Sequence, residues 1–311
     1  MDRRNFTSVS EFLLIGLSDV PELQLLFFIV FLMIYIITLL GNLSIICSYI
    51  LSTILHTPMY FFLAHFSFLD LCYISVNVPM MLVNFLAERK TVSFYGCVVQ
   101  VYTFGLCGGT ECYVLAAMAY DRYVAICHPL LYNVIMRRTV CIWLIIGSYL
   151  IGSTNSLIHT VITFTLPYCG PYMINHIFCD IPPILQLACA DTRINQIVIL
   201  VTSICVVVVS FMLIVISYIY IVAAVISLYS TSGRKKAFST CTSHFIVVTI
   251  FYGSVMFMYL KPESNASNQD RLVAVMYTVI VPLLNPFIYS LRNNDMKRAL
   301  LKIYNKLALP K

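Results

Sequence analysis

Charged residues are scarce in this sequence. They make up only 10% of its 311 residues, whereas hydrophobic residues make up 60%. Soluble domains carry about 25% charged residues, so this composition excludes a water-soluble globular protein. The apolar residues form continuous runs that approach the length of a membrane helix, about 20 residues, and they do not alternate as barrel strands would. Seven such runs lie near 25–48, 59–82, 98–126, 140–160, 196–222, 238–260 and 272–291.

Other absences exclude further classes of protein. The sequence has no His or Cys set at metal-site spacing and no nucleophile beside a base, so we expect no enzymatic activity. It has no internal repeat or inverted pair of hydropathy patterns, which argues against a transporter. Residues 1–24 carry no signal-peptide pattern, because the apolar stretch FLLIGL is short and follows Glu11. The first span is therefore expected to act as its own insertion signal.

The Lys and Arg residues indicate the orientation of the spans. With the N-terminus outside, seven of the 19 Lys and Arg residues lie in external segments and the other twelve lie on the internal side. Positive charge favours the cytoplasmic side. The prediction is an extracellular segment at 1–24, a membrane domain at 25–291 and a cytoplasmic tail at 292–311. In the tail, apolar residues at helical spacing opposite basic ones predict an amphipathic helix over 294–307 on the inner leaflet, in preference to a disordered basic tail.

Four of the twelve cysteines face outward in this topology: Cys97, Cys169, Cys179 and Cys189. An even number of cysteines in an oxidising compartment predicts two disulfides, with three pairings open. Asn5 begins a glycosylation acceptor, Asn-Phe-Thr, on the same side.

Two opposite charges, Asp121 and Arg122, stand at the end of the third apolar run, between Tyr120 and Tyr123. An ionisable pair there is unfavourable unless it lies at the membrane boundary and works as a switch. The alternative is a salt bridge at the membrane edge, which contributes little to stability.

Further polar or helix-breaking residues lie deep within the spans: Asn42, Asp70, Asn285 and Pro286. Polar groups at this depth normally face the bundle interior, where they either lock helices together or take part in a switch. Glu111 is a second buried acid, about three helical turns outward from the charged pair. Two nearby carboxylates without a buried Lys or Arg imply either a protonated carboxyl or a bound cation.

Several strings occur in order along the spans: GNLSII (41–46), PMYFFLAHFSFLDLCY (58–73), MAYDRYVAICHPLLY (118–132), KAFSTCTSHF (236–245) and PLLNPFIYSLRN (282–293). Together they closely resemble the olfactory (odorant) receptors, a branch of the rhodopsin-like G-protein-coupled receptors, over essentially the whole chain. The loop at 169–192 resembles the class II branch. His65, Phe66 and Gln186 depart from the family pattern, which affects only local packing and the external loop.

The resemblance implies an all-α membrane protein, a seven-transmembrane helix bundle with a short amphipathic C-terminal helix. It implies an odorant receptor in the plasma membrane of olfactory cilia. The expected partners are a small, mainly hydrophobic neutral volatile, a stimulatory olfactory-type G protein that raises cyclic AMP, and membrane lipids. No nucleic acid and no required cofactor are expected.

The resemblance also assigns roles to the switch residues. Arg122 is expected to pair with Asp121 at rest and to turn toward the G protein and Tyr218 on activation. The further switch positions are Tyr123, His244, Asn285, Pro286 and Tyr289. Pro286 permits a kink, and Tyr289 one turn below it swings inward. His244 either hydrogen-bonds to span three or is an ordinary core histidine.

Related receptors hold a sodium ion at the position of Asp70, and Glu111 would strengthen such a site. A protonated carboxyl remains the alternative. The resemblance further implies the disulfides Cys97–Cys179 and Cys169–Cys189.

For the ligand cavity, the resemblance points to spans three, five, six and seven: Phe104, Gly105, Gly108, Gly109, Cys112, Thr202, Ser203, Val206, Val207, Phe251, Tyr252, Val255, Met256, Tyr259 and Thr278. Such a cavity is mostly apolar with a few hydroxyls. Related amine receptors carry an acid where Phe104 stands, so an ammonium ligand is not expected. Tyr259 or Thr202 is expected to orient the ligand. Each residue has packing as its alternative role, and the glycines have close helix contact.

Two rival functions remain at this point. A small-solute transporter or channel would need polar stripes along several helices, whereas the buried charges here lie in the middle and at one end. A receptor of the same fold outside the nose, sensing a metabolite, is separated from olfaction only by its tissue of expression.

Overall fold

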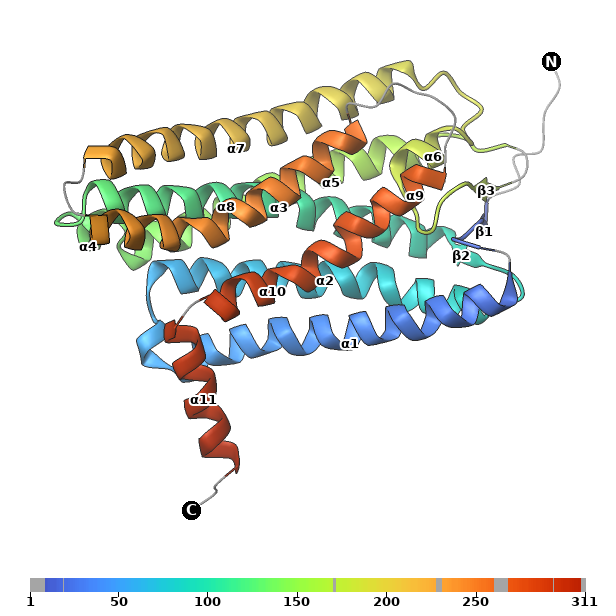
Figure 1. Cartoon of the computed structure of the whole chain (residues 1–311). Coiled ribbons are helices and arrows are strands. Elements are labelled where there is room, and N and C mark those ends of the chain that lie inside the picture. The colour runs from blue at the N-terminus through green and yellow to red at the C-terminus, as the bar shows by residue number, and fades with distance from the viewer. Residues whose placement is uncertain are drawn as a thin grey trace.

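The computed structural model describes residues 9–18, 20–169, 172–227, 231–259, 268–292 and 294–308. These residues form an elongated bundle of helices (Figure 1). Its long helices are α1 (Pro21–Leu51), α2 (Pro58–Leu86), α3 (Phe94–Cys127), α5 (Arg138–Phe164), α7 (Arg193–Ser227) and α8 (Thr231–Tyr259). The seventh span joins α9 (Asn268–Val275), the π-helical turn η2 (Met276–Ile280) and α10 (Val281–Arg292). The seven predicted runs coincide with these spans, except that the sixth was expected to reach residue 260, outside the described residues.

Five of the described helices are long and apolar enough to cross a membrane by themselves: α1, α2, α5, α7 and the stretch Arg271–Tyr289. The apolar part of α8, Cys241–Met256, is shorter. The helix α3 lies in the middle of the bundle in contact with α2, α5, α7 and α8, and its two acidic residues in the span, Glu111 and Asp121, are buried. The all-α, seven-transmembrane fold predicted from the sequence is confirmed.

Local sequence explains where the first three helices begin. Pro21 and Pro58 are the first residues of α1 and α2. Proline suits this position because its missing N–H has no partner there in any helix. The third helix is capped by Ser93, whose hydroxyl accepts from the Gly96 N–H at 3.1 Å.

A close contact of small residues holds α3 against α5. A Cβ added to Gly109 would lie 3.1 Å from the Cα of Gly152. A Cβ added to Gly152 would lie 2.4 Å from the Thr110 hydroxyl oxygen. Small residues let membrane helices approach closely enough for their backbones to pack.

A small sheet covers one end of the bundle, here called the sheet end. Its central strand β1 (Glu11–Leu14) pairs antiparallel with β2 (Thr91–Ser93) and parallel with β3 (Met173–Ile174). Phe12 in β1 is fully buried. The sequence did not predict this sheet, because its strands are two to four residues long and pair segments far apart in the chain. Asn5 lies outside the described residues.

Two disulfides join segments at the sheet end, with the pairing that the family resemblance implied. Cys97 in α3 is bonded to Cys179, just before the short helix α6 (Ile181–Leu185). Cys169 is bonded to Cys189 on the far side of α6. The disulfides and β1–β3 together fasten the long loop between α5 and α7 over this end.

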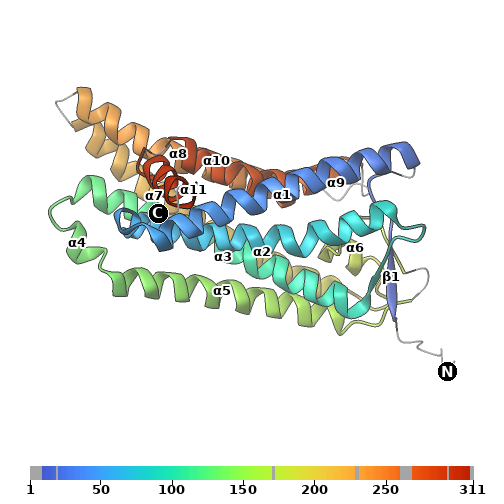
Figure 2. The ribbon, with the colours of Figure 1, turned by 90° about the horizontal axis from the view of Figure 1, so that it is seen from below.

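The opposite end, here called the α4 end, carries α4 (Tyr132–Ile135), η1 (Thr53–Leu55) and α11 (Asn294–Ala308). Figure 2 shows α4 and α11 at this end and β1 at the other. The predicted helix in the C-terminal segment is confirmed by α11. Its Met296 and Ala299 are buried in the same core as residues of the bundle, and the helix contacts α1 and η1.

Candidate functional site

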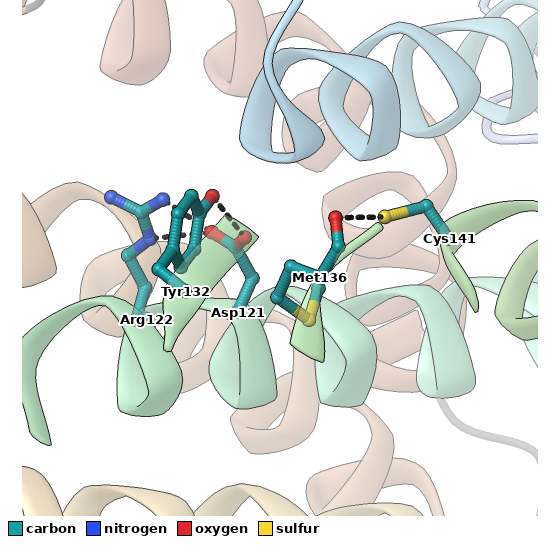
Figure 3. Close-up of polar contacts among 5 residues, drawn as sticks. All are labelled: Asp121, Arg122, Tyr132, Met136 and Cys141. Atoms are coloured by element: carbon teal, nitrogen blue, oxygen red, sulfur yellow. Dashed lines mark hydrogen bonds and ion pairs between the residues drawn. The ribbon is translucent and has the colours of Figure 1, made fainter. Parts of the chain in front are cut away.

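The α4 end of α3 holds a paired acid and base. The side chain of Asp121 is fully buried, and that of Arg122 is 12% exposed. Arg122 donates from Nε to Asp121 Oδ2 at 2.9 Å, and a terminal guanidinium nitrogen donates to the same oxygen. The hydroxyl of Tyr132 in α4 donates to Oδ1 at 2.7 Å (Figure 3). Both carboxylate oxygens are therefore engaged, and Arg122 has the pairing expected at rest.

Tyr132 was not among the predicted switch residues. It lies eleven residues beyond Asp121, and the turn at 128–131 brings the two together. Burial, and then the adjacent carboxylate, raise the pKa of the Tyr132 phenol, so it stays a neutral donor. The thiol of Cys141 in α5 donates to the Met136 carbonyl oxygen at 3.6 Å (Figure 3), which fastens the end of α4 to α5.

His244 connects three helices next to this pair. The His244 ring is fully buried in α8, with Nε2 3.1 Å from the carbonyl oxygen of Leu115 in α3. Its Nδ1 lies 2.8 Å from the hydroxyl of Tyr218 in α7, which also donates to the Cys241 carbonyl at 3.3 Å. The bond expected between His244 and span three is thus present. Among the described residues, Tyr218 bonds to these α8 groups rather than to Arg122.

Tyr252 makes a second connection between α8 and α3. Its hydroxyl donates to Ser210 Oγ in α7 at 2.8 Å and lies 3.4 Å from the carbonyl oxygen of Cys112 in α3. The ring is 2% exposed and packs against Phe211 with centroids 5.2 Å apart. Tyr252 and His244 are eight residues apart, about 12 Å along a helix. These two side chains start about two turns apart on α8 and meet α3 carbonyls that are only three residues apart, those of Leu115 and Cys112.

A buried polar network joins α1, α2 and the seventh span. Both Asp70 carboxylate oxygens accept from the Asn285 amide, each at 3.1 Å. The Asn42 amide donates to the carbonyls of Thr38 at 3.1 Å and Pro282 at 3.3 Å. One turn beyond Pro286, Tyr289 is buried, and its hydroxyl has no hydrogen-bond partner within the described residues.

Glu111 lies near this network and is 4% exposed. It is close enough to Asp70 to interact with it electrostatically. Its Oε1 is buried without a hydrogen-bond partner among the described residues. No cluster of three or more His, Cys, Asp or Glu residues suited to a metal occurs in the described part of the chain. Two carboxylates with an unsatisfied oxygen nevertheless fit a monovalent cation, which takes oxygen ligands.

In the half of the bundle nearer the sheet end, Phe104 lies within an aromatic cluster. Its ring centroid is 4.7 Å from that of Tyr73, 5.5 Å from that of Phe178 and 5.9 Å from that of Tyr277. These rings come from α2, the long loop and the π-helical turn η2. A Cβ on Gly108 would lie 4.0 Å from Tyr73, so this glycine faces the same cluster.

The other predicted pocket residues differ in burial. Those that are buried are Cys112, Val206, Phe251, Tyr252 and Thr278. Those that are half-buried are Ser203, Val207 and Val255, whereas Met256 is 36% exposed. The Thr278 hydroxyl donates to the Ala274 carbonyl at 2.6 Å. The side chain of Tyr259 lies outside the described residues.

Two glycines predicted for the pocket face elsewhere. A Cβ on Gly105 would lie 2.7 Å from the Ser156 hydroxyl in α5, and Gly109 faces Gly152 of the same helix. Gly105 was expected to share a face with Phe104, but Phe104 points toward α2 and the seventh span. Both glycines thus serve the close contact of α3 with α5, which was the alternative role.

Thr202 also points away from the predicted cavity. Its hydroxyl lies 2.6 Å from Nε2 of His159 in α5 and donates to the Val198 carbonyl at 2.8 Å. The group expected to orient a ligand is thus engaged in a contact between α5 and α7. His159 was not predicted, because nothing in the sequence indicates which face of α5 meets Thr202.

Comparison with known proteins agrees with this geometry. The sequence profile of the olfactory receptor family matches residues 31–306. The chain is 52% identical to human olfactory receptor 5AP2 over 301 residues, which cover 96% of this chain and 95% of that protein. It is 49% identical to human olfactory receptor 5A2 over 300 residues, with coverage of 96% and 93%. The chain belongs to the olfactory receptor family.

As an olfactory receptor, the chain is a multi-pass membrane protein and not an enzyme. The polar contacts of this receptor gather in two places. One comprises Asp121, Arg122 and Tyr132 at the α4 end, and the other is the network around Asp70 in the middle of the bundle. Sequence reasoning missed Tyr132, His159 and Ser210. Only Tyr132 carried a signal, as the last residue of the string MAYDRYVAICHPLLY.

Proposed function

We propose that this receptor binds a small, mainly hydrophobic, neutral volatile among α3, α7, α8 and the seventh span. Binding favours an arrangement in which α8 moves away from α3 at the α4 end. Arg122 then leaves Asp121 and contacts a stimulatory olfactory-type G protein, which raises cyclic AMP. A ligand shifts such an equilibrium only through its different affinities for the two arrangements.

The chemistry around Phe104 supports a neutral, apolar ligand. Aromatic rings of Tyr73, Phe178 and Tyr277 surround it, and an ammonium group would find no carboxylate at this position. Tyr252 and Ser210 supply hydroxyls on α8 and α7, beside Cys112, which is about two turns along α3 from Phe104. A site with apolar walls and few hydroxyls is suited to a small molecule with at most one hydrogen-bonding group.

The observation that carries the proposal is the way α8 meets α3. The bonds of Tyr252 and His244 to carbonyl oxygens of Cys112 and Leu115 exist only while the two helices remain together. A ligand that displaces the Tyr252 ring would break the first bond and weaken the hold of α8. On α3 the second bond lies three residues, less than one turn, nearer Arg122, so the displacement is carried toward the charged pair.

The first test is cyclic AMP in cells that express the receptor with an olfactory-type G protein, across a broad panel of volatiles. A response that Arg122→Ala abolishes at equal surface level supports the coupling. Arg137→Ala is the matched control, because Arg137 is an exposed arginine at the same end. A response retained in Arg122→Ala would overturn the assigned role of Arg122. Silence of the wild type at proven surface level would favour a non-olfactory ligand.

We further propose that Asp70 and Glu111 hold a sodium ion that stabilises the resting arrangement and leaves on activation. The unsatisfied Glu111 Oε1 and its proximity to Asp70 support this site. Sodium should raise the melting temperature of the purified receptor relative to potassium, and Glu111→Gln should abolish the difference. A melting temperature of the wild type that is independent of sodium would leave the protonated carboxyl as the explanation.

The proposed orientation places the sheet end outside the cell and the α4 end in the cytoplasm, in the plasma membrane of olfactory cilia. The two disulfides at the sheet end suit an oxidising compartment. Glycosylation of Asn5 would test the orientation: a glycan removed enzymatically from wild type and missing in Asn5→Gln supports it. Modification of a tag at the C-terminus by an impermeant reagent on intact cells would contradict it.

A further inference from the structure

A cavity lies away from the residues that we propose to bind the odorant. It has a volume of about 500 Å³ and lies between α3, α5 and α7. Its walls include Tyr120 and Tyr123 of α3, Trp143 and Gly147 of α5, and Tyr220 of α7. None of the residues proposed to bind the odorant lines it.

The cavity opens to the outside of the bundle. Trp143 is 66% exposed, Tyr220 56% and Tyr120 38%. Because these helices cross a membrane, the outside of the bundle there is lipid. A ligand for this cavity must therefore enter from the bilayer, and one that is mainly apolar is favoured.

The position of the cavity along the helices limits the shape of its ligand. Of its four tyrosines, Tyr120, Tyr123 and Tyr220 lie toward the α4 end, where polar groups meet the membrane boundary, and Tyr113 lies deeper on α3. The deeper wall contains Ile151, which is thirteen residues from the start of α5 at Arg138 and so about 20 Å along the helix. Since the hydrocarbon core is about 30 Å thick, the cavity extends from one boundary to about the midplane.

The charge of the walls separates two classes of lipid. None of the lining residues is Lys, Arg or His, so the walls themselves offer no cationic side chain to the phosphate of a phospholipid. His128, which is 3.0 Å from the Tyr123 hydroxyl, lies outside the lining. A neutral hydroxyl, by contrast, finds phenol groups at the mouth. The segment from Leu115 through Tyr120 to Arg122 also fits a short pattern associated with cholesterol contact, although that pattern has little weight alone.

Gly147 leaves open space in the wall formed by α5. A Cβ built on it would meet no atom within 4 Å, so the space beside this residue is open. A rigid ring system can lie against such a surface, whereas a side chain there would occupy its place. We propose that the cavity binds a membrane sterol, with its hydroxyl at the tyrosines and its rings against Gly147.

A bound sterol would stabilise the arrangement seen here. The rings of Tyr123 and Tyr220 are 5.6 Å apart and already join α3 to α7, and the Cys127 thiol donates to the Tyr220 carbonyl at 3.6 Å. These contacts lie next to Arg122, which is paired with Asp121. Sterol is therefore expected to favour the paired arrangement and to oppose coupling.

The test is photolabelling of the purified full-length receptor in lipid nanodiscs with a diazirine-bearing cholesterol analogue. We expect labelled peptides from α3, α5 or α7 at this cavity, and competition by unlabelled cholesterol. Gly147→Leu fills the cavity and should weaken labelling about tenfold, because it excludes apolar contact worth about 1.4 kcal/mol. Gly253→Leu is the matched control, since a Cβ on Gly253 in α8 also meets nothing within 4 Å.

Both variants must melt at a temperature close to that of the wild type, which shows that they are folded. If Gly147→Leu does not fold, Gly147→Ala replaces it as a smaller change at the same position. Equal labelling of this cavity in wild type and Gly147→Leu would overturn the proposal. So would labelled peptides confined to other surfaces, or equal labelling at the cavity by a phospholipid with a diazirine in its acyl chain. This measurement needs no odorant or G protein, so it is independent of the function proposed above.

Discussion

Removing the Tyr132 hydroxyl tests whether the contacts around Asp121 keep the receptor at rest. In the structure Asp121 is fully buried and accepts from Arg122 on one oxygen and from Tyr132 on the other. Tyr132→Phe keeps the ring and deletes only the bond of 2.7 Å to Oδ1. The carboxylate then has one donor fewer in an environment that water does not reach.

The magnitude follows from the type of bond. A hydrogen bond to a charged group contributes about 1.5–3 kcal/mol. If this free energy is present only in the paired arrangement, its loss shifts the equilibrium toward the released form by about 10- to 150-fold. Basal cyclic AMP should therefore rise in Tyr132→Phe, and the half-maximal odorant concentration should fall.

The assay is basal and odorant-stimulated cyclic AMP, normalised to receptor at the cell surface. Tyr95→Phe is the control, because Tyr95 is 80% exposed at the sheet end and its hydroxyl should not matter. The combined variant Tyr132→Phe with Arg122→Ala should be silent, since Arg122 makes the G-protein contact. Basal activity of Tyr132→Phe equal to that of the wild type would refute the reasoning, because the bond would then contribute equally in both arrangements.

The remaining predictions concern stability, measured as the melting temperature of purified receptor in detergent. Gly152→Ala would place a Cβ 2.4 Å from the Thr110 hydroxyl oxygen and should destabilise the receptor by about 1–3 kcal/mol. An unchanged melting temperature would show instead that α3 and α5 separate easily. Replacing Cys169 and Cys189 by serine opens a loop with a sequence separation of 20 and should lower the free energy of unfolding by about 3 kcal/mol. An unchanged melting temperature would mean that the other contacts of the loop hold it in place without this disulfide. Burial raises the pKa of Asp180 in the folded receptor above its value in the unfolded chain. The protonated carboxyl therefore stabilises the fold fully at pH values below the unfolded pKa, and this contribution is lost as the pH rises through the folded pKa. Asp180→Asn, which keeps an oxygen for the backbone contact, should therefore melt higher than wild type at pH 7, with a smaller difference at pH 4, and the reverse order would contradict this.

The sequence predicted the spans because membrane crossing is a local property. A run such as 25–48 needs no partner to exclude charge, and it lies within α1. The helix α11 was likewise predicted from the spacing of its apolar residues. The structure adds that Met296 is buried against the bundle, a contact that periodicity cannot specify.

Some contacts of the candidate site could be predicted from the sequence and others could not. Asp121 and Arg122 are adjacent in the chain, so their pairing needed no knowledge of the fold. The bond between Asp70 and Asn285 joins residues 215 apart, and from their depth in the spans we expected only that both face the bundle interior. The predicted faces of Gly105 and Thr202 were wrong, because helical spacing does not say which neighbour a face meets.

The sequence by itself determined that the chain crosses a membrane, where its charged pair lies and which family it belongs to. These properties follow from composition, from local spacing and from strings of adjacent residues. Only the tertiary structure decided that β1 pairs with β2 and β3, that Tyr132 completes the hold on Asp121, and that α3, α5 and α7 leave a cavity beside Gly147. Each of these depends on rotations and separations of helices, which are determined by side-chain packing throughout the bundle rather than by any local segment.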